Sequence, residues 1–152
     1  MKNISRKHAN NWPNILVLLG LAVLFPLGAS AQNLAATVEA LDDCVKKMDM
    51  QIIIDPVTES VKVERRFVEQ VLVTKRYKVS DLVYIKVIAA KSGKAQEEIL
   101  NTYAKRNWAS ALKQEGVDKE EIQTQMDEAY MELATRILDI DTKKNDRRTA
   151  KK

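Results

Sequence analysis

Glycine and proline, the residues that most often make turns, are scarce through most of this chain. Beyond residue 31 only Pro56, Gly93 and Gly116 remain. A β fold of this length needs many tight turns, which these residues favour, whereas long helices need few. The sequence therefore predicts a mainly α-helical fold, a small bundle of about five helices.

The spacing of apolar residues locates the helices. Ser80 is a suitable N-terminal cap for a helix that stops at Gly93. Because this helix has almost no polar face, we expect it to be the most buried one. Its inward residues should be nearly inaccessible: Leu82, Ile85, Ile88 and Ala89. Other helices are predicted at about 66–77, 97–106, 108–116 and 118–140.

The secondary structure of the first part of the domain, residues 34–65, is less clear from the sequence. Apolar residues alternate at spacings of four and three from Leu34 to Ile52, which indicates one stripe of an amphipathic helix. For residues 50–65 we favour a short β-hairpin, since β-branched residues alternate with polar ones around a turn at Asp55 and Pro56. The alternative is a helix that Asp55 caps and Pro56 begins.

Residues 1–31 have the pattern of a secretory signal peptide. A basic start precedes the 13-residue apolar run from Ile15 to Leu27, and Ala29-Ser30-Ala31 supplies a cleavage pattern of small residues. We expect the mature chain to begin at Gln32 and to be exported, to a bacterial periplasm or the medium, with no transmembrane segment after cleavage. The alternative is an uncleaved N-terminal anchor, although the apolar run is shorter than a membrane span requires.

The mature chain divides into a body and a tail by charge. Residues 32–141 form the predicted single domain, with a net charge of −4, and residues 142–152 carry +5. The tail has almost no apolar residue to bury, so we expect disorder, with attachment to an anionic envelope surface as the functional interpretation. Nucleic acid is an unlikely partner of an exported chain without interleaved aromatics. The tail's basic residues are Lys143, Lys144, Arg147, Arg148, Lys151 and Lys152.

Several kinds of catalytic site are excluded by composition. The only histidine, His8, lies in the predicted signal, and Cys44 is the only cysteine. A Ser-His-Asp arrangement, a Cys-His pair and the usual zinc sites are therefore absent from the mature chain. The acidic pair Asp42-Asp43 and two similar pairs suit helix starts and solvated faces. We expect no catalytic residue, cofactor or metal.

The candidate interaction residues lie on the first helix and in one aromatic position. Cys44 is best interpreted as a small buried residue at the edge of the first stripe, with an intermolecular disulfide or a reactive thiol as alternatives. Trp108 fits a core position better than a partner anchor. The remaining candidates form the stripe, through which we expect a partner protein or a second copy to bind: Leu34, Val38, Leu41, Val45 and Met48.

Part of the helix punctuation resembles that of small exported bacterial helical proteins of unknown function. A Ser-Gly turn in Lys91-Ser92-Gly93-Lys94 is followed by Glu97-Glu98-Ile99-Leu100, and then by Asn107-Trp108 and Gly116-Val117. The resemblance covers about a quarter of the chain. It implies a bacterial origin and no particular activity.

The sequence favours a non-catalytic role, that of an exported interaction, adaptor or envelope-associated protein. The alternative is a small exported enzyme that uses carboxylates and lysines. A concave pocket that gathers such residues would favour the enzyme, whereas an exposed apolar stripe along residues 34–52 would favour binding.

Overall fold

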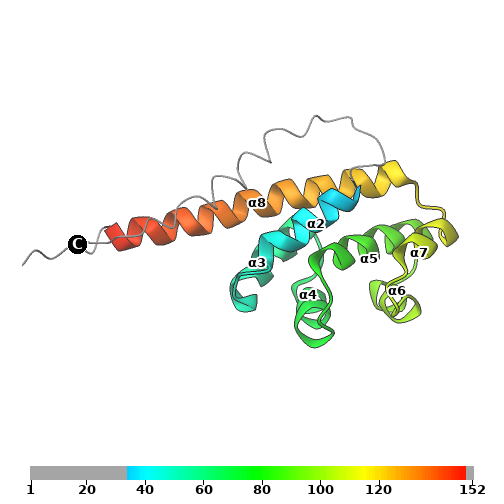
Figure 1. The fold of residues 1–152 in the computed structure, drawn as a ribbon. Coiled ribbons are helices and arrows are strands. Elements are labelled where there is room, and N and C mark those ends of the chain that lie inside the picture. The colour runs from blue at the N-terminus through cyan, green and yellow to red at the C-terminus, as the bar shows by residue number, and fades with distance from the viewer. Residues whose placement is uncertain (1–33, 150–152) are drawn as a thin grey trace, which may run out of the picture.

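The computed structural model describes the backbone of residues 34–149 and the side chains of residues 34–143. The predicted signal peptide, Lys151 and Lys152 lie outside this part of the chain. The described residues form helices joined by short turns, and no strand occurs among them (Figure 1). The elements are α2 (Leu34–Val45), α3 (Met50–Val61), α4 (Arg65–Glu69), a π-helical turn η1 (Gln70–Thr74), α5 (Val79–Ser92), α6 (Gln96–Thr102), α7 (Trp108–Gln114) and α8 (Lys119–Thr149).

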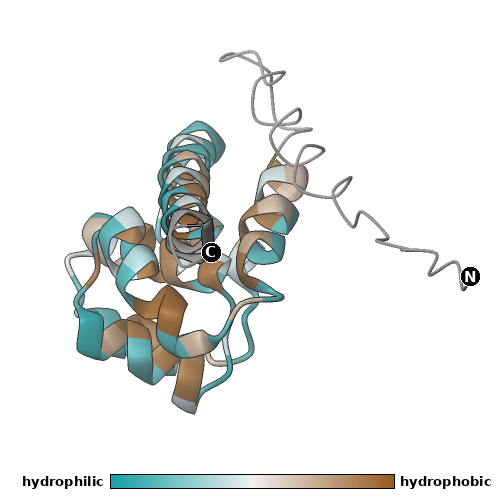
Figure 2. Cartoon of the chain, turned by 90° about the vertical axis from the view of Figure 1, so that its left-hand side faces the viewer, coloured by the Kyte–Doolittle hydropathy of each residue, from teal (hydrophilic) through white to brown (hydrophobic). Residues whose placement is uncertain are grey.

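The helices are arranged around α5, with the long α8 along one side. α8 packs against α2, α3 and α5, while α6 and α7 also pack against α5 (Figure 1). A view along α8 shows the most hydrophobic ribbon between the helices and hydrophilic ribbon on the outer faces (Figure 2). The mainly α-helical prediction is confirmed, although these residues make seven α-helices rather than about five.

The central helix has the burial that its sequence predicts. Leu82, Ile85 and Ile88 are fully inaccessible, and Ala89 is nearly so. Nine of the 14 residues of α5 are buried, because neighbours cover almost its whole circumference. This prediction is confirmed, and α5 is the centre of the core.

The predicted hairpin at residues 50–65 is wrong, because α3 occupies most of this segment. The Asp49 carboxylate accepts a hydrogen bond from the Gln51 N–H at 2.9 Å and caps the helix. Ile53, Val57 and Val61 follow one another at intervals of four, and all three are buried. A short run of β-branched residues fits both a strand and a helix, and here packing against α8 and α5 selects the helix.

The position of Pro56 differs from both sequence interpretations. It lies inside α3 rather than at a turn or at the first helical position. Proline has no N–H, so the carbonyl one turn earlier loses its usual partner. Pro56 is buried, and its own carbonyl accepts a hydrogen bond from the Ser60 hydroxyl at 2.7 Å. Burial of this helix face therefore outweighs one missing backbone bond.

The two glycines end helices as the sequence predicts, whereas the N-terminal cap of one helix differs from the prediction. Gly93 and Gly116 both adopt a φ of +69°, the left-handed geometry expected after a helix. The cap of α5, however, is Lys78 rather than Ser80, which lies inside the helix. The first predicted stripe is also divided, since α2 ends at Val45 and Asp49 starts a new helix.

The last helix is longer than the charge pattern suggests. α8 continues to Thr149, so the backbone of residues 142–149 is helical in the segment expected to be a disordered tail. Lysine and arginine are good helix formers, which is compatible with this continuation. At 1.5 Å per residue the 31 residues of α8 extend for about 46 Å. Its C-terminal part projects beyond the other helices (Figure 1).

Candidate functional site

The apolar stripe of the first helix is used inside the molecule. Leu41 is fully buried, four other stripe residues are partly buried against the core, and Ile52 at the end of the stripe is 47% exposed. A hydrogen bond also joins α2 to α8, because the Thr37 hydroxyl donates to the Asp127 carboxylate of α8 at 2.9 Å. The half-buried stripe residues are Leu34, Val38, Val45 and Met48. The apolar stripe of α2 therefore already packs against α8 of the same chain.

Cys44 is a half-buried free thiol that packs against the core. Burial raises the pKa of this thiol to about 11, and the Asp43 carboxylate adds to the rise. A thiolate is the reactive form of cysteine, so a raised pKa disfavours a nucleophilic role. This environment suits the interpretation of Cys44 as a small packing residue.

Trp108 is a core residue with one polar anchor. Its indole N–H donates to the Asp81 carboxylate at 2.6 Å, and its ring stacks on Tyr84 with 5.5 Å between centroids. Asp81 also accepts the Lys78 backbone N–H at 2.8 Å. The tryptophan therefore ties the start of α7 to the first turn of α5.

A second carboxylate reaches the same turn from another helix. Asp42 of α2 accepts hydrogen bonds from the Ser80 N–H at 3.0 Å and the Ser80 hydroxyl at 2.9 Å. The N-terminus of a helix carries unpaired N–H groups and a partial positive charge, which carboxylates stabilise. The side chains of Asp42 and Asp81 are only 11% and 6% exposed. Both carboxylates therefore mainly form contacts within the molecule, at the start of α5.

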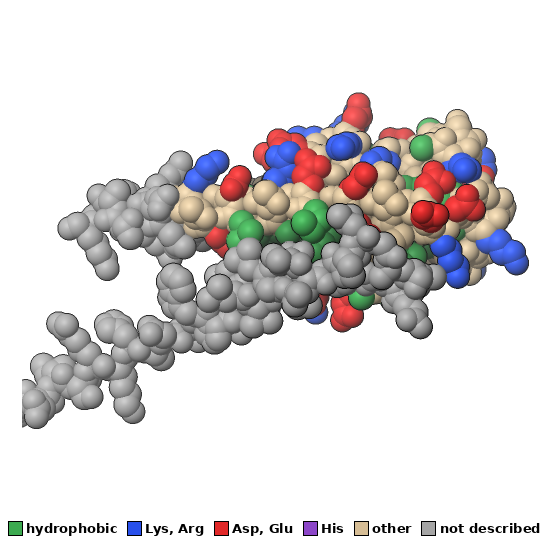
Figure 3. Space-filling model, turned by 90° about the horizontal axis from the view of Figure 1, so that it is seen from above, with side chains coloured by type: hydrophobic (Ala, Val, Ile, Leu, Met, Phe, Trp, Pro, Cys, Tyr) green, Lys and Arg blue, Asp and Glu red, His purple; other side chains and the backbone are tan. Residues whose placement is uncertain are grey.

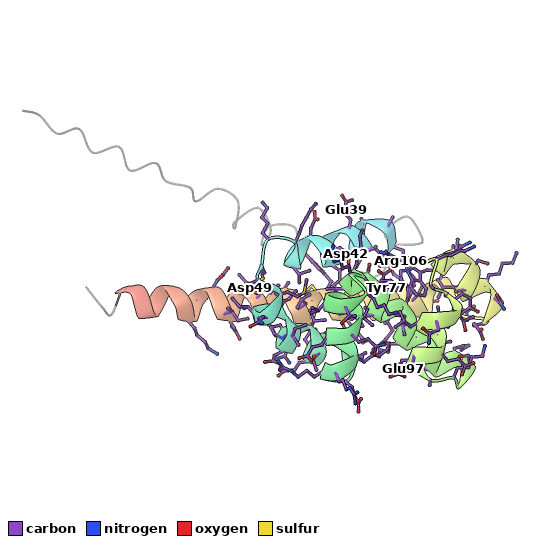
Figure 4. All side chains as sticks on the ribbon, turned by 90° about the horizontal axis from the view of Figure 1, so that it is seen from below. Glu39, Asp42, Asp49, Tyr77, Glu97 and Arg106 are labelled. Carbon is purple, nitrogen blue, oxygen red and sulfur yellow. The ribbon has the colours of Figure 1, made fainter. Side chains whose placement is uncertain are left out.

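Two loops meet beside this turn. The Tyr77 hydroxyl donates to the carbonyl of Ala104 at 3.0 Å. The Arg106 guanidinium lies 4.4 Å above the centre of the Tyr77 ring, a cation–π contact. The same guanidinium lies 3.8 Å from Asp81. Figure 4 shows Tyr77 and Arg106 next to each other, with Asp42 nearby on α2 and Glu97 apart on α6.

The backbone of both loops is unusual. Arg76 and Arg106 have φ values of +55° and +56°, a left-handed conformation that is costly for residues other than glycine. The π-helical turn η1 leads directly into the first loop, and the Tyr77 N–H bonds back to the Val71 carbonyl at 3.0 Å. Such strain and π-helical turns are frequent at functional sites.

The outer face of these loops is strongly basic. Five cationic side chains are exposed around Tyr77, and two of them pair with largely buried acids, Lys78 with Asp42 at 3.5 Å and Arg106 with Asp81 at 3.8 Å. We call this region the two-loop basic surface. It consists of Lys75, Arg76, Tyr77, Lys78, Lys105 and Arg106. Fixed cations beside an aromatic ring can bind phosphate or carboxylate groups.

Sequence reasoning did not identify this surface. The sequence predicts helices over residues 66–77 and 97–106, which places Tyr77 and Arg106 at the ends of two separate helices. The available signal was that Lys75-Arg76-Tyr77-Lys78 and Lys105-Arg106-Asn107 are both basic runs at helix boundaries. Nothing in the spacing shows that two runs that begin 30 residues apart meet.

Carboxylates and lysines do gather at one cavity, as the enzyme alternative requires. The cavity lies between α3, α5 and α8, and Lys62, Lys86, Glu128 and Glu132 contribute to its lining. Burial and then Lys62 lower the pKa of Lys86. The cavity volume is only about 10 Å³, roughly one water molecule. This geometry gives little support to an enzyme.

The basic end of α8 can be placed only in part. The side chain of Lys143 is exposed, and Lys144, Arg147 and Arg148 continue the helical backbone. No helix of the described chain is both long and apolar enough to cross a bilayer. Within the same residues, no group of three or more His, Cys, Asp or Glu side chains is placed to hold a metal ion.

Comparison with known proteins adds no assignment. No family model, curated protein or solved structure matches this chain.

Proposed function

We propose that this protein is an exported, non-catalytic binding protein that attaches to an anionic surface of the cell envelope. The observation that supports the proposal most directly is the two-loop basic surface. It presents five exposed cations, of which Lys78 and Arg106 pair with the largely buried acids Asp42 and Asp81, whereas no acid pairs with the other three among the described ion pairs. The predicted signal peptide supports the location, and the basic end of α8 supplies a second group of cations.

The surface is held in place before any ligand arrives. Tyr77, Arg106 and Trp108 join the two loops to the start of α5 through one hydroxyl bond, one ring contact and one buried indole bond. Ordering flexible side chains during binding costs free energy, so a prearranged surface binds more tightly than the same charges on a mobile chain.

Binding to vesicles tests the proposal. The mature chain should bind phosphatidylglycerol vesicles at low salt and phosphatidylcholine vesicles weakly. Binding should decrease as salt rises, because exposed charges are screened over about 8 to 10 Å at physiological ionic strength. Mass spectrometry of the native protein should find Gln32 at the N-terminus if export occurs as proposed.

Matched charge reversals identify the binding face. The double variant Lys75→Glu and Lys105→Glu should weaken vesicle binding about tenfold or more, since each lysine near an anionic membrane contributes about 1 kcal/mol. The control carries the same charge change on exposed residues elsewhere, Lys47→Glu with Lys119→Glu. Equal losses in both double variants would show that net charge alone matters and would reject the two-loop basic surface.

A further inference from the structure

Lys86 is a half-buried lysine in the middle of the central helix. It lies between Ile85 and Val87, which are both buried, and it lines the small cavity between α3, α5 and α8. Its amine donates a hydrogen bond to the amide oxygen of Gln125 on α8 at 3.0 Å. None of the described ion pairs includes Lys86. A neutral amide is therefore the partner of this charged group.

A second lysine of the same helix is placed differently. Figure 3 shows Lys and Arg side chains interspersed with Asp and Glu side chains over the face seen from above, along which α8 runs. Lys91, five residues after Lys86, is exposed and pairs with the Glu121 carboxylate of α8 at 3.4 Å. Lys86 and Lys91 therefore compare two amines between the same two helices, one bonded to an amide and one paired with a carboxylate.

The charged groups around Lys86 leave its own charge poorly balanced. Glu132 lines the cavity but pairs with an arginine of its own helix at 2.8 Å, and Glu128 accepts a hydrogen bond from the Gln125 amide at 3.2 Å. Lys62, at the end of α3, lines the same cavity. Burial and then Lys62 lower the pKa of Lys86, while the two glutamates oppose this change. The amine thus loses its proton more readily than an ordinary lysine does.

We propose that Lys86 is a nucleophilic amine that forms imines with small uncharged aldehydes. Only the unprotonated form of lysine is a nucleophile, and burial and a neighbouring cation both favour that form. Lys86 has both, through its helix packing and through Lys62. The cavity of about 10 Å³ suits a short aldehyde, and the mixed charges around it suit an uncharged one.

The reaction needs no group other than the aldehyde. Lys86 gives its proton to water, and its nitrogen then attacks the carbonyl carbon to form a carbinolamine. Loss of one water molecule leaves a C=N bond in place of the C=O bond. Lys86 and the groups around it do not belong to the two-loop basic surface, so this reaction is independent of the proposed attachment to the envelope.

Reductive methylation of the mature chain tests the proposal, with formaldehyde as the aldehyde and dimethylamine–borane as the reductant of the imine. Mass spectrometry of the peptides gives the rate at each lysine. At neutral pH Lys86 should react about threefold faster than Lys91 or more, since each unit by which a lysine pKa falls raises the unprotonated fraction about tenfold. In guanidinium chloride, where the chain is unfolded, the ratio should fall to about one. A smaller ratio in the folded chain, or the same ratio in both states, would overturn the proposal.

Two single variants show whether charge sets the rate. Lys62→Gln removes the neighbouring cation, so the pKa of Lys86 should rise and its methylation should slow about twofold or more. Glu128→Gln removes a carboxylate but keeps an acceptor for the Gln125 amide, so methylation should become faster by about the same factor. Lys91 is the internal control and should not change in either variant. Equal rates of Lys86 in all three proteins would show only an accessible amine and would reject the proposal.

Discussion

The two helices α5 and α8 use their apolar residues differently. α5 has most of its 14 residues buried and lies at the centre of the domain. α8 is more than twice as long, yet its fully buried residues end at Leu133. The domain thus uses all of α5 but only part of α8. Apolar residues on α5 are almost all packed in the core, whereas beyond Leu133 the apolar residues of α8 are at most partly buried, as Ile137 is.

The largest expected effect is that of truncating the central helix. Ile85→Ala should lower the free energy of unfolding by about 2 to 5 kcal/mol, since it leaves a cavity at a fully buried site. Met131→Ala on an exposed face of α8 is the control and should change it by less than about 0.5 kcal/mol. Urea unfolding measures both. Equal losses of unfolding free energy would mean that these residues of α5 and α8 contribute equally to stability.

A smaller effect is expected where α5 begins. Asp42→Ala removes the acceptor of the Ser80 N–H and hydroxyl, so unfolding should become easier by about 1 to 3 kcal/mol. The neighbouring Asp43→Ala is a matched control, because the Asp43 side chain is 51% exposed and forms an exposed ion pair with Lys46 at 3.3 Å. Its loss should stay below about 0.5 kcal/mol. If the two variants have the same melting temperature, the bonds from Asp42 to Ser80 do not stabilise the start of α5.

The smallest effect is expected at the free end of α8. Deleting residues 142–152 should leave the melting temperature of the monomer almost unchanged, since these residues lie beyond the last fully buried position. The same deletion should weaken binding to anionic vesicles at low salt. A large fall in melting temperature would instead mean that the end of α8 is docked on the domain.

Local sequence patterns predicted the fold well where each pattern was compatible with only one structure. The apolar circumference of α5 and the two helix-ending glycines each specify one outcome. At residues 50–65 the signal was too short, because Ile52, Ile53 and Ile54 fit a strand or a helix equally well until the rest of the face is known. Pro56 then favoured a turn, although the packed helix accommodates it.

The candidate site was missed for a different reason. Tyr77 and Arg106 are 29 residues apart, and Asp42 lies 38 residues before Ser80. Helical periodicity describes neighbours within a few turns and contains no information about such pairs. The acidic pair at residues 42 and 43 looks uniform in the sequence, whereas in the fold the Asp42 side chain is only 11% exposed and that of Asp43 is 51% exposed.

The pairing of α2 with α8 has a consequence for the order in which the chain folds. Thr37 bonds to Asp127, 90 residues later, so α2 cannot take its final place until α8 has been made. The contacts of α4 with η1 and of α5 with α6 join neighbours in the chain and can form earlier. Closing the longest loop last is the slow step expected of distant contacts. We therefore expect the first helix of the domain to dock last.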